Sequence, residues 1–243
     1  MSMAYRKRAG RSGPRPRSLK NWTMSLLAVP VPALWQLTFL DRDGRPEEKQ
    51  RLMRAYRRFI QRHLYFHGPE KNLLSKNPSF TPWMETLADA FPDARFIGCL
   101  RSPSAAVPSQ VNSILIGARL FDGRDTTGYW REGFLAMLEY YYRHLLEVVN
   151  QMPEQRQALS VMETLASAPG ETVQGFYQRF GWQPDTQFCE RLQEQDRKAK
   201  QYRSGHHYSS DELGISPHEL VDVFGWVYER FGYPLPNTDE KPL

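Results

Sequence analysis

Four polar side chains within one short segment of the chain suit the binding of a phosphate or sulfate group. In chain order they are Lys76, Arg101, Ser104 and Ser109. Arginine and lysine pair with anionic oxygens, and hydroxyl groups donate hydrogen bonds to the same atoms. The residues alone leave two interpretations open: a cradle for an anion, or ordinary charges carried by loops.

Three short apolar runs are the elements that must position these side chains. We expect strands over 72–75, 94–100 and 158–162, each of which leads into a helix. That alternation predicts an α/β fold with a parallel sheet flanked by helices. Parallel strands present their carboxyl ends at one edge of a sheet, so Lys76 and Arg101 should both project there. The helix that Pro103 begins would add backbone N–H groups to the same edge.

Helical spacing of apolar residues fills the rest of the pattern. We expect helices over 46–67, 81–90, 103–114, 128–150, 171–180 and 216–232. The first of these carries five arginines on faces away from its apolar side. That row suits either an anion-binding surface or the solvated face of an amphipathic helix.

Several motifs in this order resemble the sulfotransferase superfamily, in its broad bacterial branch. The chain has Leu74-Ser-Lys-Asn-Pro78 for the pattern L-K-(S/T)-P, Phe91-Pro-Asp-Ala-Arg-Phe-Ile97, then Arg101-Ser-Pro103, with Ser109 eight residues after Arg101. Two later segments, around Val161–Pro169 and 201–216, are similar to the branch's Y-E-D-L…P and Y-S-x-x-x-x-G-L-S patterns. The resemblance covers roughly residues 45–235.

The resemblance implies a P-loop-like α/β fold and a sulfate donor, 3′-phosphoadenosine 5′-phosphosulfate (PAPS). Arg101 and Ser109 would bind the donor's 3′-phosphate, and a closing segment with Arg203, Ser204 and Gly205 would reach the same phosphate. Lys76 would stabilise charge that develops on the bridging oxygen during transfer of the sulfuryl group. The acceptor would be a hydroxyl or an amine on a small molecule, glycan or protein.

Two parts of the family pattern are not found in this sequence. The loop (P/G)-R-S-G-T-(T/S), which wraps the 5′-phosphosulfate, has only the isolated string Gly10-Arg-Ser-Gly13 as a counterpart, and no apolar strand precedes it. The usual histidine base corresponds to Phe80 or its neighbours, and Glu163 is expected to be structural. The alternative is therefore a truncated, inactive relative that binds a nucleotide or another anion. A sheet without its first strand would also have an unpaired edge, which predicts marginal stability or self-association.

Charge is distributed unevenly along the 243 residues, whose formal net charge is +5. Residues 1–20 carry seven basic side chains and no acidic one, whereas the remainder has a net charge of −2. We therefore expect a disordered basic tail over 1–20 and a single α/β domain over 21–243. This distribution does not favour a specific nucleic-acid-binding domain, although the tail could contact an anionic partner.

Residues 24–40 follow the basic tail as an apolar segment, in the order typical of a signal anchor. Pro30 and Pro32 interrupt this short segment, which favours a buried element and a cytoplasmic protein over membrane insertion. Cys99 is expected to be a small buried hydrophobe. His63 and His67 have the spacing of metal ligands on a helix but no third ligand, so we expect no metal site.

Overall fold

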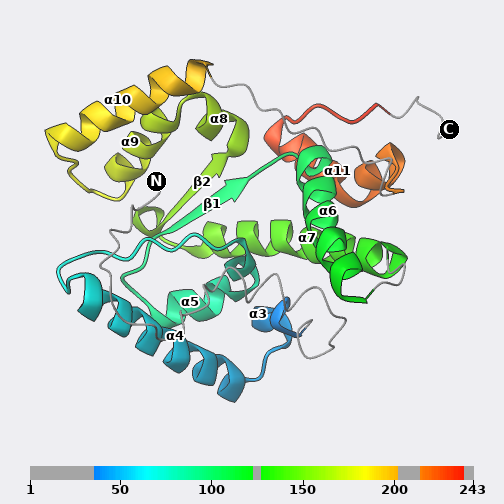
Figure 1. Cartoon of the computed structure of the whole chain (residues 1–243), viewed down its shortest axis with the longest axis horizontal. Helices are drawn as coiled ribbons and strands as arrows, with labels where there is room; N and C mark the ends of the chain where they lie inside the picture. Colours follow the sequence, from blue (N-terminus) through cyan, green and yellow to red (C-terminus); the bar gives the residue numbers. More distant parts are fainter. Residues whose placement is uncertain (1–35, 123–126, 202–213, 238–243) are drawn as a thin grey trace.

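The computed structural model describes residues 36–122, 127–201 and 214–237. These residues form an α/β structure with a small parallel sheet surrounded by helices (Figure 1). Its elements are α3 (Leu40–Asp43), α4 (Pro46–His67), the 3-10 helix η1 (Pro78–Trp83), α5 (Met84–Ala90), β1 (Phe96–Leu100), α6 (Pro103–Asp122), α7 (Thr127–Gln151), the 3-10 helix η2 (Glu154–Arg156), β2 (Gln157–Val161), α8 (Met162–Ser167), α9 (Pro169–Arg179), α10 (Thr186–Gln201) and α11 (Pro217–Phe231). The fold class predicted from the sequence is confirmed.

The sheet that the described residues form has two strands, β1 and β2, which pair in parallel with Phe96 opposite Gln157 and Leu100 opposite Val161. The predictions of these two strands and of their direction are correct. The strand expected over 72–75 is wrong: this segment has no regular secondary structure and pairs with no strand of the described residues. A strand exists through its ladder of hydrogen bonds, and apolar residues without a partner strand cannot make one.

The two faces of β1 differ in how far they are covered. Gly98 and Leu100 are buried on the face that packs against α7; a Cβ atom built on Gly98 would lie 3.0 Å from Leu145. Ile97 and Cys99 alternate with them and are exposed on the opposite face. The prediction that Cys99 is buried is therefore wrong. An apolar run shows that a strand is present, but whether its second face is covered depends on packing that the run does not encode.

Helix α7 is the centre of the core. Its buried face includes Phe134, Leu138, Leu145 and Val149, and α6 and α11 pack against it toward one end. Figure 1 shows α8, α9 and α10 on the β2 side of the sheet, and α3, α4 and α5 below α7. The expected helices are all present, but α6 continues to Asp122, beyond its predicted end at 114, and the first part of the helix predicted over 81–90 belongs to the 3-10 helix η1. Helices α3, α8 and α10 were not predicted from the sequence.

A buried polar cluster fastens α3 to α5 and α7. The Asp41 carboxylate accepts hydrogen bonds from the backbone N–H of Glu85 (2.9 Å), from the N–H and hydroxyl of Thr86, and pairs with His144 Nε2 at 2.8 Å. Burial alone would raise the pKa of Asp41, but the hydrogen bonds from His144, Thr86 and the two backbone groups outweigh it and lower the pKa below its usual value. Every oxygen of this carboxylate is therefore satisfied inside the protein.

Candidate functional site

Arg101 lies where the sequence predicted it, directly after the carboxyl end of β1. Its side chain is exposed, and none of the described residues forms a hydrogen bond or ion pair with its guanidinium group. Its backbone is held in place, because the buried Tyr142 of α7 donates its hydroxyl to the Arg101 carbonyl. A fixed backbone with a free guanidinium group is suited to binding an external anion.

The first turn of α6 follows Arg101 at once, and part of its binding capacity is used internally. The Ser104 hydroxyl lies 2.6 Å from the Tyr228 hydroxyl, and either oxygen can be the donor of this hydrogen bond. Ser104 was expected to be available to an anion together with Arg101. In this structure α11 supplies a neutral partner for its hydroxyl.

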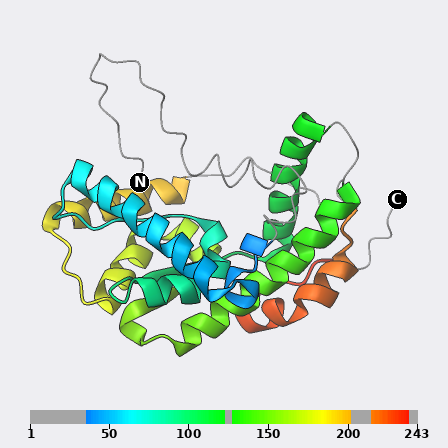
Figure 2. The same cartoon turned by 90° about the horizontal axis from the view of Figure 1, so that it is seen from below.

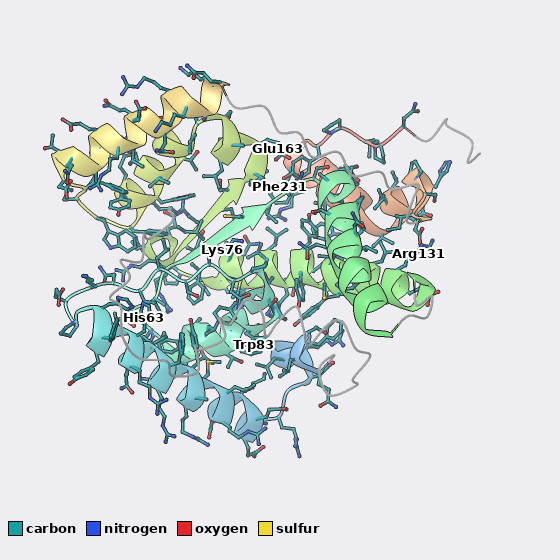
Figure 3. All side chains as sticks on the ribbon, in the orientation of Figure 1. His63, Lys76, Trp83, Arg131, Glu163 and Phe231 are labelled. Atoms are coloured by element: carbon teal, nitrogen blue, oxygen red, sulfur yellow. The ribbon has the colours of Figure 1, made fainter. Side chains whose placement is uncertain are left out.

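Lys76 belongs to the extended segment before η1 and does not end a strand. Its side chain is exposed and lies near β1, since its charge acts on the Cys99 thiol: partial desolvation raises the pKa of Cys99, and Lys76 opposes that increase. Arg101 lies two residues after Cys99, so Lys76 and Arg101 are both close to the second half of β1. In Figure 3 Lys76 lies apart from Glu163 and Phe231, which are close to the ends of the strands.

Glu163 and a group of tyrosines surround the carboxyl ends of the strands. Glu163 is exposed in the first turn of α8, directly after β2, and Figure 3 places it near Phe231 of α11. Burial raises the pKa of Tyr233 to about 12, and the charge of Glu163 contributes to this increase. Burial likewise raises the pKa of Tyr142, with a smaller opposing effect from Arg101. All three tyrosines, Tyr142, Tyr228 and Tyr233, therefore stay protonated near neutral pH and can donate hydrogen bonds.

These tyrosines are the part of the edge that the sequence reading missed. Tyr142 is one of three consecutive tyrosines in a long amphipathic helix, and nothing in that pattern distinguishes it from its neighbours. Tyr233 follows α11, and its buried hydroxyl has no hydrogen-bond partner among the described residues. A tyrosine two residues past a helix end carries no signal for a site in another part of the sequence.

The remaining predicted site residues divide into two groups. Ser109 lies in α6, partly exposed, and takes part in an interaction within the structure. Arg203, Ser204 and Gly205 lie outside the described residues, as do residues 1–35 with the basic tail and most of the apolar segment 24–40.

No group of three histidine, cysteine or acidic side chains in the described residues could hold a metal ion. The rings of His63 and His67 lie in tilted contact, with their centroids 4.4 Å apart. None of the described helices combines the length and the apolar character needed to cross a bilayer.

Comparison with known proteins assigns this arrangement to a family. A model of the sulfotransferase family matches residues 3–187. The structure is similar to the crystal structure of sulfotransferase STF9 from Mycobacterium avium, with a TM-score of 0.56 and 22% sequence identity. The match covers 66% of this chain but 42% of the mycobacterial one, so this chain spans less than half of that protein's length. A search of curated proteins found no match.

Proposed function

Because the chain belongs to the sulfotransferase family, we propose that it binds PAPS and transfers the sulfuryl group to a hydroxyl or amine acceptor. The observation that carries the proposal is Arg101: an exposed guanidinium group, without a partner among the described residues, at the carboxyl end of β1. In open α/β sheets this edge is where ligands bind. The activity itself is our inference, since the structural match supports the fold alone.

Arg101 would hold the 3′-phosphate by two parallel N–H···O hydrogen bonds. Tyr142 fixes the backbone from which the guanidinium group extends, so the binding geometry is set before the nucleotide arrives. Ser109 of α6, and Arg203, Ser204 and Gly205 beyond α10, would complete the phosphate site. For these four residues the support is the motif resemblance.

Lys76 would act at the other end of the donor. Transfer forms a bond from the acceptor oxygen or nitrogen to sulfur and breaks the bond between sulfur and the bridging oxygen, which leaves with the electron pair on the 5′-phosphate. The acceptor's proton is released to water. An ammonium group near that oxygen stabilises the charge that develops on it. Lys76 is exposed beside β1, which is consistent with this role.

A second function, nucleotide or anion binding without transfer, is favoured by a different observation. The Ser104 hydroxyl is already engaged by Tyr228, so fewer hydrogen bonds remain for a substrate than the motif suggests. No described residue stands out as the general base. A protein with this site could bind a nucleotide through its 3′-phosphate without transferring a sulfuryl group.

Calorimetry with 3′-phosphoadenosine 5′-phosphate tests the binding step. We expect measurable binding that Arg101→Ala weakens by about 30-fold, because a charge-assisted hydrogen bond contributes about 1.5–3 kcal/mol. The matched control is Arg95→Ala, which removes an exposed arginine just before β1 begins and should leave the affinity unchanged. Absence of binding at millimolar nucleotide in a folded sample would contradict both proposed functions.

Turnover separates the two proposals. A labelled PAPS donor with phenol and amine acceptors should give a sulfated product if the chain is a transferase. Nucleotide binding that depends on Arg101, together with no transfer to either acceptor class, would instead support the binding function.

A further inference from the structure

Helix α4 carries a row of arginines whose charges the described structure leaves uncompensated. Arg51, Arg54, Arg58 and Arg62 follow one another at intervals of three or four residues, so they lie on one face of the helix. We call them the arginine stripe. All four are exposed, and no described residue forms a hydrogen bond or ion pair with any of them. At a rise of about 1.5 Å per residue, the stripe is about 16 Å long.

The inward basic residues of the same helix behave differently. Lys49 donates to the Asp41 carbonyl at 2.7 Å, and Arg57 donates to the Ala90 carbonyl and lies over the Phe91 ring. These contacts fasten α4 to its neighbours. The stripe lies on the side opposite Met53, which is buried, and is not needed for this packing. Figure 2 shows α4 in front of the other elements, and in Figure 3 nitrogen-tipped side chains point away from the body along its lower side.

Two of the most exposed apolar side chains of the described residues lie where the stripe ends. Tyr65 is 89% exposed and Phe66 78%. We call them the apolar end. Both belong to the last turn of α4. Large side chains this exposed bury little of their surface in the fold.

We propose that α4 binds the surface of an anionic lipid bilayer, with the arginine stripe on the headgroups and the apolar end inserted at the boundary with the acyl chains. Arginine attracts anionic headgroups, and tyrosine and phenylalanine are stable at the interface of a bilayer. The combination favours a bilayer as the partner, because a duplex nucleic acid would use the charges but would leave Tyr65 and Phe66 in water. The protein lies on the membrane in this proposal and does not span it.

Co-sedimentation of the full chain with vesicles of phosphatidylcholine and phosphatidylserine tests the proposal, with phosphatidylcholine vesicles as the reference. Three variants each replace three basic residues by glutamine: Arg54, Arg58 and Arg62 on α4, Arg191, Arg197 and Lys200 on α10, and Arg11, Arg15 and Arg17 in the tail. We expect the α4 variant to lose about 100-fold in partition, because each basic residue near an anionic surface contributes about fivefold. The α10 variant has the same net charge and should bind like the parent.

A fourth variant, Tyr65→Ser with Phe66→Ser, should lower the partition by about tenfold or more, because it removes the inserted apolar groups. Unchanged far-UV circular dichroism verifies that each variant is folded. The proposal is overturned if the tail variant loses binding while the α4 variant keeps it. It is also overturned if the parent ignores phosphatidylserine vesicles yet binds duplex DNA or RNA through the arginine stripe.

Discussion

Two helices of this protein begin beside a polar side chain from a distant part of the sequence, but the two side chains differ. At the start of α5, the Asp41 carboxylate accepts the backbone N–H groups of Glu85 and Thr86, which the helix itself leaves unpaired. At the start of α6, the Tyr228 hydroxyl lies 2.6 Å from the Ser104 hydroxyl.

The difference is one of charge. At α5 a buried carboxylate neutralises the positive end of the helix, and that end is closed to any ligand. At α6 the partner is a neutral hydroxyl, and the exposed Arg101 stands beside it. The positive end of α6 and the arginine are therefore still uncompensated, and an anionic ligand can bind there. A hydrogen bond from a distant residue at the N-terminus of a helix can therefore hold two elements together, as at α5, or leave a binding site beside it, as at α6.

The largest effect should come from removing the carboxylate at α5. Asp41→Ala leaves His144 and two helix N–H groups buried without a partner, so we expect the free energy of unfolding to fall by about 3–5 kcal/mol. Urea denaturation measures it. Asp43→Ala is the matched control, because that exposed carboxylate pairs only with the exposed Arg42 and should contribute less than about 1 kcal/mol. Equal losses of unfolding free energy in the two variants would show that the Asp41 cluster does not hold α3, α5 and α7 together.

The charge of Asp41 also predicts how stability depends on pH. The pKa of Asp41 is lowered in the folded protein, so its stabilisation is fully present above the unfolded pKa and is lost as the pH falls through the folded pKa. Each unit of difference between the two pKa values corresponds to about 1.4 kcal/mol. Denaturation of the parent between about pH 5 and pH 2 should show this loss. Asp41→Asn should reduce that slope; an unaltered slope would assign it to other carboxylates.

The sequence predicted the site at the start of α6 better than the polar cluster at the start of α5. The reason is the separation along the chain between the residues that interact. Arg101 follows an apolar run and precedes Pro103, so its place between a strand and a helix is encoded within a few neighbours. Asp41 and His144 are more than a hundred residues apart in the chain, and neither has a local pattern that points to the other. Tyr228 and Ser104 are separated in the same way.

The errors in the predicted sheet have a related cause. The run 72–75 has the composition of a strand, but strand formation requires a partner, which local sequence cannot supply. Cys99 has the apolar neighbours of a buried residue, yet its face of β1 stays uncovered by the described residues. Local pattern therefore predicts elements and the residues at their ends, while the covering of each surface depends on how distant segments pack.

Tyr142→Phe tests whether Arg101 is positioned in advance. The variant removes the donor to the Arg101 carbonyl, so we expect a loss of about 1 kcal/mol in stability. If the binding geometry depends on this bond, the affinity for 3′-phosphoadenosine 5′-phosphate should fall by about fivefold, as calorimetry would measure. Tyr141→Phe removes the same atom from the adjacent residue and is the control. Weakened stability with unchanged affinity would make Tyr142 a purely structural residue.

Tyr228→Phe should give the smallest effect and the sharpest test of the comparison. Removal of a neutral hydroxyl from the start of α6 should cost about 0.5–1 kcal/mol of stability, well below the loss in Asp41→Ala, because no charge is left buried without a partner. The freed Ser104 hydroxyl would then face the nucleotide site with Arg101, so the affinity for 3′-phosphoadenosine 5′-phosphate should rise. Thermal melts and calorimetry measure the two effects separately. If the affinity falls instead, the Tyr228 hydroxyl itself contacts the nucleotide. The start of α6 would then be a binding site in which the ligand forms a hydrogen bond with Tyr228 and does not displace it from Ser104.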